Sequence, residues 1–392
     1  MTVFEREVTI VGAGPSGALC AAYLAKAGID VLLLERDIFP REKACGDVLR
    51  EGFVSHVEAL GIAGDLDAMS TCVRRLKLIS DDGHTTTIPF ECYCAPRRDV
   101  DSLLVDTAIS LGAEAKQGCT VTDVLTEQGT VRGVKAVYRG EEISVRSKLT
   151  IGADGAFSTL AAAAGVVKEE AGSMWIGRRA YFTGVRLDRA LAKGQYDAYG
   201  VIGFSSLLGT GYFWIIPVGK EGVRHGICNV GMLINGREEY ESVDIERCFS
   251  RWLESRPEMA AMFEGASIIS PWQGGRISDM SCGIHKAGHG FMVIGDAAAL
   301  MTPLSHDGLS PAADSAKAAA EAATDALAAG DFSQNMLISS YGKHFRTKGE
   351  KALSEEMKEK RLLMESMRDP GTMNRIVELL ESDQVFRRKH LK

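Results

Sequence analysis

The chain lacks several features that mark nucleic-acid-binding, membrane-spanning and metal-binding proteins. Its 45 Lys and Arg are outnumbered by 52 Asp and Glu, and the net charge of −7 gives no general attraction to a nucleic acid. No apolar stretch reaches the roughly 18 residues that a membrane-spanning helix needs. The nine cysteines include no Cys-x-x-Cys pair, so the sequence predicts neither a disulfide framework nor a metal or iron–sulfur site.

The first residues lead directly into a strand pattern and leave no room for a signal peptide. We therefore expect a cytoplasmic protein, with peripheral contact with a membrane surface as a further possibility for its C-terminal part. The length of 392 residues, with 45% hydrophobic and 25% charged residues, is enough for two fused domains with a large core.

Residues 6–36 carry the complete pattern of a βαβ unit that holds a dinucleotide. After an apolar strand, Gly12 permits a tight turn, Gly14 lets the backbone approach a pyrophosphate, and Gly17 lets the helix pack close to the strand. The N-terminus of that helix offers free N–H groups and its positive dipole end to the phosphates. Glu35 ends the second strand, where a carboxylate accepts ribose hydroxyls and repels a 2′-phosphate. The pattern predicts FAD or NAD.

A second strand and turn, with Gly295-Asp296 followed by Pro303 and Gly308-Leu309, favours FAD over NAD alone. Asp296 at the end of a buried strand is suited to accept a hydrogen bond from a ribityl hydroxyl. The alanine-rich helix that begins near Gly308 directs its positive end across the loop, where it stabilises an anionic reduced flavin.

The remaining patterns predict an α/β (α+β) fold in which a Rossmann-like domain carries an inserted antiparallel-sheet domain and C-terminal helices. Between about residues 175 and 290 strand patterns dominate, with one helix near residues 244–255. The predicted nucleotide-binding domain comprises residues 1–75, 97–172 and 286–332, the predicted substrate domain residues 76–96 and 173–285, and the C-terminal helical region residues 333–392.

These motifs amount to a family resemblance. The glycine loop 12–17, the Gly-Ala-Asp-Gly turn 152–155 and the Gly295-Asp296 strand end resemble, in this order, the three sequence marks of FAD-dependent enzymes of the para-hydroxybenzoate hydroxylase fold. Segments 39–47, 212–217 and 369–376 look like the geranylgeranyl reductase branch. Enzymes of that branch saturate isoprenoid double bonds in lipid precursors, chlorophyll side chains or menaquinone tails.

The motifs and the resemblance together imply a set of FAD-binding residues. This set is Gly12, Gly14, Pro15, Ser16, Gly17, Glu35, Arg36, Cys45, Gly46, Arg98, Val121, Asp154, Gly155, Gly295, Asp296, Pro303, Gly308 and Leu309. Arg98 is included because it precedes Asp101 in an Arg-x-x-Asp-x-Leu-Leu pattern, the family position of a flavin-side arginine.

Cys45, Tyr212 and Trp214 are the candidate catalytic residues. Alkene saturation needs an apolar groove, a defined approach to the flavin and a proton source. Tyr212 and Trp214 alternate on one strand face and are either walls of that groove or ordinary core aromatics. Cys45 is either a weak acid beside the flavin or a residue whose backbone lines the cofactor. His306 is explained equally well by a flavin-facing loop and by a solvated turn.

The electron donor is left open by the sequence. Hydroxylases of this fold commonly carry an arginine shortly after the Asp-Gly turn, whereas this chain continues Ser158-Thr-Leu-Ala-Ala-Ala-Ala. That departure counts against tight NADPH binding, so the expected reductant is ferredoxin, which is an electron-donor protein, a quinol-linked carrier or loosely bound NAD(P)H. The expected substrate is a hydrophobic isoprenoid.

Two other functions compete with the reductase. Strand 211–217 also resembles the Gly-Trp-x-Trp-x-Ile-Pro strand of flavin-dependent halogenases, a class related to aromatic monooxygenases. Tyr212 in place of the first tryptophan, and Cys45-Gly46-Asp47 in place of Gly-Glu-Ser, count against that function. A flavin-binding electron carrier that converts no substrate is the second alternative.

Overall fold

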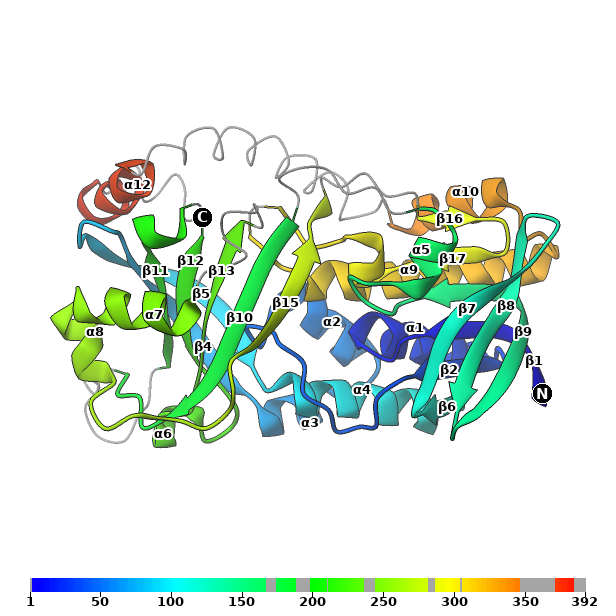
Figure 1. The fold of residues 1–392 in the computed structure, drawn as a ribbon, viewed down its shortest axis with the longest axis horizontal. Coiled ribbons are helices and arrows are strands. Elements are labelled where there is room, and N and C mark those ends of the chain that lie inside the picture. The colour runs from blue at the N-terminus through cyan, green and yellow to red at the C-terminus, as the bar shows by residue number, and fades with distance from the viewer. Residues whose placement is uncertain are drawn as a thin grey trace.

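The protein has two lobes side by side, each organised around one β-sheet (Figure 1). The computed structural model describes residues 2–166, 174–187, 198–209, 211–235, 244–280, 286–303, 305–345 and 371–383. Among these residues, no helix is long and apolar enough to cross a membrane.

The first sheet has the order β16-β17-β9-β1-β2-β6, with β8 and then β7 added beyond β9. Strand β1 pairs in parallel with β2 and β9, and β9 pairs in parallel with β17. The centre of this sheet is therefore parallel and buried, as a Rossmann-like domain requires. The strands are β1 (Thr2–Val11), β2 (Val31–Glu35), β6 (Glu114–Gln117), β7 (Cys119–Glu127), β8 (Thr130–Tyr138), β9 (Glu141–Gly152), β16 (Ala287–Gly288) and β17 (Phe291–Val293).

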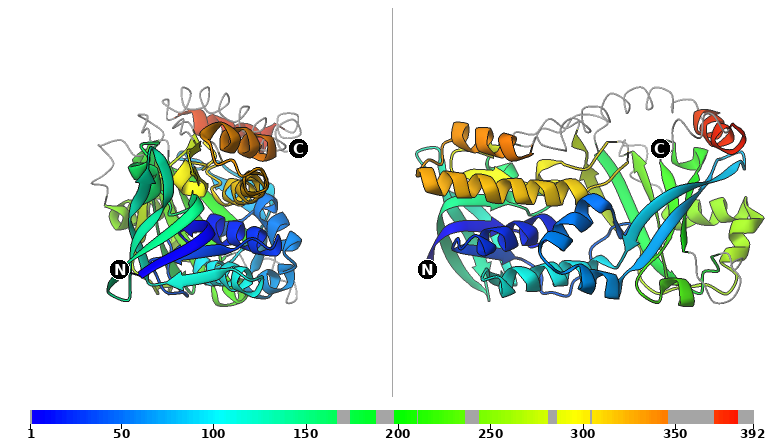
Figure 2. Two further views of the ribbon diagram at one scale, coloured as in Figure 1. Left: turned by 90° about the vertical axis from the view of Figure 1, so that its right-hand side faces the viewer. Right: turned by 180° about the vertical axis from the view of Figure 1, so that it is seen from behind.

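Helices α1, α4 and α9 gather beside this sheet, where the reverse view shows them in front (Figure 2). Helices α1 and α9 pack through alanines, whose small side chains allow a close approach of the two backbones. Gly330, with φ of 65°, ends α9 as a left-handed cap. The helices of this lobe are α1 (Pro15–Lys26), α2 (Glu51–Ala59), α3 (Ala63–Met69), α4 (Arg97–Ser110), α5 (Thr159–Ala163), α9 (Leu309–Ala329) and α10 (Gln334–Phe345).

The second sheet has the order β14-β10-β13-β12-β11-β4-β5-β3, with β15 also paired to β10. Its pairs are antiparallel except for β11 with β4, which run parallel. Its strands are β3 (Val48–Leu49), β4 (Thr71–Ile79), β5 (Thr85–Cys94), β10 (Met174–Thr183), β11 (Tyr199–Phe204), β12 (Tyr212–Pro217), β13 (Cys228–Asn235), β14 (Ser267–Ile268) and β15 (Gln273–Ser278). The expected mixed α/β fold with a largely antiparallel second sheet is confirmed.

Strand β12 shows how the second sheet separates two cores. Its residues Phe213 and Ile215 pack with α7 (Ile245–Glu254) and α8 (Pro257–Met262), while Trp214 and Ile216 pack on the opposite face. This alternation follows from the period of two in a strand. The opposite face, which also carries the half-buried Tyr212, is the one that concerns the site. The short helix α6 (Gly222–His225) lies between β12 and β13.

The C-terminal part is helical where it is described, in α10 and in α12 (Gly371–Ser382). Helix α12 packs on β5 of the second lobe, far from α10 on the first (Figure 1). Part of the predicted C-terminal helical region lies outside the described residues, including its apolar Leu353, Met357, Leu362, Met364 and Met367 and the Asp369-Pro370 of segment 369–376.

The domain division stays a prediction, but sheet membership differs from it at one point. Strand β3 and the beginning of β4 pair in the second sheet, whereas the predicted boundary at residue 75 leaves them with the first domain.

Candidate active site

The glycine loop joins β1 to α1 and is shaped by close backbone contacts. A Cβ on Gly17 would lie 1.9 Å from the carbonyl oxygen of Gly12, and one on Gly12 would lie 2.5 Å from that of Ala153. Gly12 also has a φ of 94°, which favours glycine. Around Gly14 the nearest group is Arg41 Nη2 at 3.9 Å, so its backbone faces open space. The loop therefore leaves room for a phosphate at Gly14 and at the N-terminus of α1.

Glu35 is held beside this loop. It is 6% exposed, and its Oε2 accepts from the N–H of Ala13 at 2.7 Å while its Oε1 accepts from that of Asp37 at 3.0 Å. Each carboxylate oxygen of Glu35 accepts one main-chain hydrogen bond and keeps a further lone pair that can accept from a ribose hydroxyl. Arg36 points away from the loop, with 74% of its side chain exposed.

The structure brings the three sequence marks together. A Cβ on Gly12 would contact Ala153 and Asp154, and one on Gly295 would lie 2.5 Å from Ser16 Oγ. One on Gly308 would lie 3.7 Å from Asp296 Oδ1, so this carboxylate stands at the N-terminus of α9. Segments far apart in the sequence thus surround one site.

Other predicted cofactor residues have local structural roles. The carboxylate of Asp154 accepts from Ser158 Oγ and from the N–H of Thr159, which caps α5, and burial raises its pKa. Five others are placed as follows: Pro15 at the first position of α1, Gly155 in the turn with φ of 82°, Val121 half-buried on β7, and Pro303 and Leu309 buried on either side of the α9 N-terminus.

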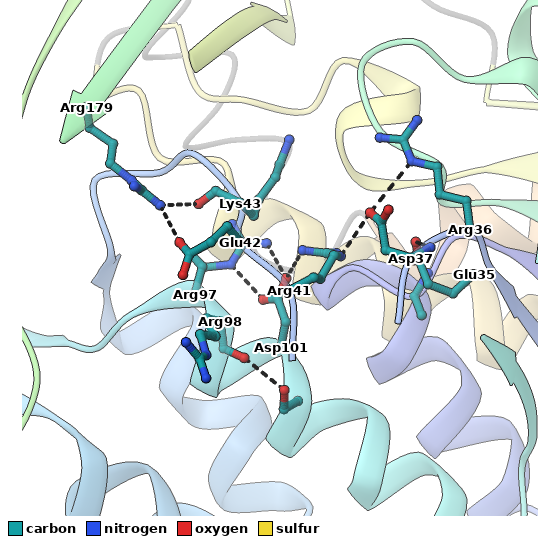
Figure 3. A network of polar contacts seen from close by, with 12 residues as sticks. Glu35, Arg36, Asp37, Arg41, Glu42, Lys43, Arg97, Arg98, Asp101 and Arg179 are labelled. Carbon is teal, nitrogen blue, oxygen red and sulfur yellow. Dashed lines mark hydrogen bonds and ion pairs between the residues drawn. The ribbon is translucent and has the colours of Figure 1, made fainter. Parts of the chain in front are cut away.

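A buried arginine lies next to the predicted one (Figure 3). Arg97 donates from Nε and Nη2 to the two carboxylate oxygens of Asp101, at 2.7 and 2.9 Å, and Arg41 Nη1 donates to the same carboxylate at 3.1 Å. Arg98 has an exposed side chain, and its carbonyl accepts from Ser102 Oγ. The group that reaches inward from α4 is therefore Arg97.

Arg97 also contacts Cys45. Burial opposes the charge of Arg97, but Asp101 and the Cys45 thiol outweigh that effect and raise its pKa. Burial likewise raises the pKa of Cys45, against a smaller opposing effect of Arg97. At neutral pH Cys45 is a thiol rather than a thiolate.

Asn229 connects the Cys45-Gly46-Asp47 loop to Trp214. Its Oδ1 accepts from Trp214 Nε1 at 2.8 Å, and its Nδ2 donates to the Cys45 carbonyl at 2.7 Å and to Asp47 Oδ2 at 2.8 Å. A Cβ on Gly46 would lie 4.0 Å from Trp214 Cε2. The structure therefore joins two predicted catalytic residues, Cys45 and Trp214, through an amide that the sequence analysis did not identify.

Two residues of β10 hold the same loop. Tyr181 donates its O–H to Asp47 Oδ2 at 2.5 Å, and the Arg179 guanidinium lies 4.2 Å from the centroid of the Tyr181 ring. Arg179 Nη2 donates to Glu42 Oε2 at 3.0 Å and to the Lys43 carbonyl at 3.2 Å (Figure 3). Arg179 is only 1% exposed, so these hydrogen bonds between the lobes start from a buried side chain on the second sheet.

Aromatic rings extend this face beyond Trp214. The Tyr212 ring centroid lies 6.2 Å from that of Trp214 and 5.7 Å from that of His306, which lies 4.2 Å from that of Trp175. Burial raises the pKa of Tyr212, so its phenol stays protonated. Tyr212 and Trp214 lie on one face as expected, and their catalytic role stays a prediction.

Only some of the residues that the sequence analysis did not select carry a recognisable signal. Asn229 is the polar residue near the start of a strand that is buried throughout. Asp47 has a left-handed φ of 61°, a conformation that a short polar residue tolerates. Arg179 and Tyr181 have no sequence signal, because their partners lie more than a hundred residues away.

Comparisons with known proteins agree with this geometry. The chain matches the FAD binding domain family over residues 5–353. It is 29% identical over 390 residues to digeranylgeranylglycerophospholipid reductase 2 of Methanopyrus kandleri, covering 98% of this chain and 92% of that protein. It is 31% identical over 355 residues to digeranylgeranylglycerophospholipid reductase 1 of Methanococcoides burtonii, with coverage of 87% and 80%. It is 31% identical over 330 residues to menaquinone reductase of Mycolicibacterium smegmatis, with coverage of 81% and 76%.

Solved structures share the fold. A geranylgeranyl bacteriochlorophyll reductase-like protein from Thermoplasma acidophilum aligns with a TM-score of 0.82 at 22% identity, covering 97% of this chain and 92% of that one. A flavin-dependent brominase aligns with a TM-score of 0.75 at 24% identity, covering 98% of each chain.

The cradle at Gly14, the buried Glu35 and Asp296 at the α9 N-terminus fit FAD, and the expected cofactor is confirmed. The chain is an FAD-dependent oxidoreductase and belongs to the geranylgeranyl reductase family.

Proposed function

We propose that this protein saturates C=C bonds of an isoprenoid chain carried by a lipid or a quinone. When bound and reduced, FAD supplies the hydride for such a reaction. The names of the relatives support a lipid or quinone substrate, since they include phospholipid reductases and a menaquinone reductase.

The observation that carries the proposal is the apolar face of the second sheet beside the Cys45-Gly46-Asp47 loop. Trp214 packs there with Leu76, Ile216, Leu233 and Met301. An isoprenoid offers only hydrocarbon surface for recognition, so an apolar and aromatic wall is the surface it requires. The Trp214–Asn229 bond fixes the indole in one orientation.

In this reaction the chain's own residues bind and orient the substrate and exclude water from it. Tyr212 and Trp214 line the approach and keep water away from the reacting carbons. Arg97, through its bond to Cys45, and Asn229, through its bonds to the loop, hold the peptide backbone of that loop in place. The reductant, NAD(P)H or ferredoxin, and contact with a membrane surface are further parts of this proposal.

Anaerobic turnover tests the proposal. The holoenzyme is reduced with dithionite and mixed with a geranylgeranyl glycerophospholipid or a polyprenyl menaquinone, and flavin absorbance and product mass are followed. We expect the flavin to reoxidise while the product gains two hydrogen atoms for each saturated bond. The Trp214→Phe variant is expected to reoxidise about 10- to 100-fold more slowly, because the ring loses its anchoring N–H.

Trp272→Phe is the matched control, because Trp272 packs against Phe182 and Phe249 on the other face of the sheet. It is expected to reoxidise at the rate of the unaltered protein. If the flavin stays reduced until oxygen is admitted, and the product then contains oxygen or halogen, a monooxygenase or halogenase replaces the reductase. If no product forms with any donor, the protein is an electron carrier.

A further inference from the structure

The N-terminus of α9 is capped by a carboxylate of the chain itself. Asp307 Oδ1 accepts from the N–H groups of Leu309 and Ser310, at 3.0 and 3.1 Å, and its Oδ2 accepts from Ser310 Oγ at 2.7 Å. All three partners are donors, which is the arrangement that suits an ionised carboxylate, because such a group only accepts. Two of the free N–H groups at this helix end are therefore already satisfied by a negative charge.

We propose that Asp307 sets the charge beside the flavin, so that it lowers the reduction potential of bound FAD and favours a reduced flavin protonated at N1. The helix dipole alone predicts the opposite, an anionic reduced flavin stabilised by the end of α9. The inference goes beyond the proposed function, because it depends on the binding of FAD and holds for any substrate.

The loop that carries Asp307 lies between the first lobe and the aromatic face of the second sheet. On one side, the ring centroid of His306 lies 5.7 Å from that of Tyr212. On the other side, a Cβ on Gly308 would lie 3.7 Å from Oδ1 of Asp296, just after β17. The two chain neighbours of Asp307 thus contact the two surfaces between which the reacting part of FAD is expected.

The charge of Asp307 is not compensated by a cation. In the part of the chain that the structure describes, Asp307 takes part in no ion pair. The titratable groups next to it are His306, whose ring faces Tyr212, and the further acid Asp296. A helix end supplies about half a positive charge, whereas a carboxylate carries a full negative one. Because Asp307 is half-buried, solvent screens this negative charge only in part.

The loop keeps its shape without the charge of this side chain. The N–H of Asp307 donates to Thr302 Oγ1 at 2.9 Å, and its carbonyl accepts from the N–H of Thr302, also at 2.9 Å. Asparagine caps helices about as well as aspartate, and its amide oxygen can accept from the same N–H groups. Asp307→Asn therefore removes the negative charge and retains the cap.

The charge acts on the flavin through the protonation of N1. Reduction adds two electrons and one proton at N5, and a second proton binds at N1 when the surroundings disfavour a negative charge there. A nearby carboxylate raises the free energy of the anionic form, so this proton is taken from solvent and returns to solvent on reoxidation. A reduced flavin of higher free energy is a stronger hydride donor, which suits a C=C bond without an activating group.

The reduction potential of the holoenzyme, measured anaerobically against a reference dye, tests the inference without any substrate. At a pH where the reduced flavin is anionic in both proteins, Asp307→Asn is expected to favour the reduced form by about 10- to 100-fold. This factor raises the two-electron potential by about 30 to 60 mV. The pH midpoint at which the reduced flavin loses its N1 proton, followed by absorbance, is expected to fall by about one to two pH units in the same variant.

Asp244→Asn is the matched control, because Asp244 also caps a helix. Its Oδ1 accepts from the N–H of Arg247 at 3.1 Å at the start of α7, on the second lobe. This variant is expected to keep the potential and the midpoint of the unaltered protein. Asp307→Ser, which also retains a capping oxygen without the charge, is expected to show the same two shifts as Asp307→Asn.

Equal potentials and equal N1 midpoints in Asp307→Asn and the unaltered protein, with FAD bound to both, would overturn the inference. Loss of FAD from both neutral variants would overturn it as well, because the carboxylate would then hold the helix end and not set the potential. Neither reading needs a lipid or a quinone. If neither compound reoxidises the flavin, the proposed function fails while the shifts in Asp307→Asn still support the inference.

Discussion

At the scale of single residues, contacts between main-chain atoms decide the geometry of the flavin site. Residue 17 must be glycine, because a Cβ there would lie 1.9 Å from the carbonyl oxygen of Gly12. Relieving that clash would require the main chain of the loop to move. We expect Gly17→Ala to weaken FAD binding by about tenfold or more, measured by flavin fluorescence titration of the apoprotein. Gly64→Ala is the control, since its Cβ would meet open space on α3. Unchanged affinity in Gly17→Ala would contradict this account.

Single residues also show which parts of the flavin site can be predicted from the sequence. The glycines were identified because each does something that no other residue can do. Arg97 was missed in favour of Arg98, because neighbours on a helix differ by about 100° in direction and the sequence does not say which side faces inward. The flavin-contact role of either arginine stays a prediction.

At the scale of elements, α12 is attached to the second lobe by few contacts. Val377 and Leu380 are its buried residues, Asn374 Oδ1 accepts from the N–H of Asp81, and the Leu380 carbonyl accepts from Thr86 Oγ1. We expect Leu380→Ala to cost about 2 kcal/mol or more locally. Amide hydrogen exchange in residues 371–382 should then increase. Arg375→Ala, which breaks an exposed pair with Glu378, should leave that exchange nearly unchanged.

Elements differ in how far the sequence predicts them. The alanine-rich helix predicted to begin near Gly308 is confirmed as α9. The parallel pairing of β11 with β4 was not predicted, because more than a hundred residues separate the two strands and pairing direction leaves no local pattern.

At the scale of the whole molecule, buried polar side chains join the two lobes. Arg179 reaches from β10 to Glu42 and Lys43, and its Nε and Nη1 have no hydrogen-bond partner among the residues that the structure describes. We expect Arg179→Met to release the loop, so that hydrogen exchange of residues 42–47 increases. Its effect on the free energy of unfolding should be small, because the buried charge is removed together with its bonds. Arg178→Met, on the exposed side of the same strand, is the control. Unaltered exchange in Arg179→Met would show that the loop needs no such tie.

The assembly of the first sheet from separated segments was predictable, because each segment ends in a glycine-containing turn. The ties between the lobes were not, because they depend on where two sheets meet in space.

The strand order of the first sheet has a consequence for synthesis on the ribosome. Strand β1 is made first, yet its neighbour β9 ends at residue 152, and β17, which leads to Gly295 against Ser16, is made only after most of the second lobe. Strand β1 has both neighbours once β9 is made, but residues 150–152 of β9 must wait for β17 while most of the second sheet emerges. Flavin capture is consequently a late event, and a chain that stalls before residue 296 presents an exposed strand edge that chaperones must cover.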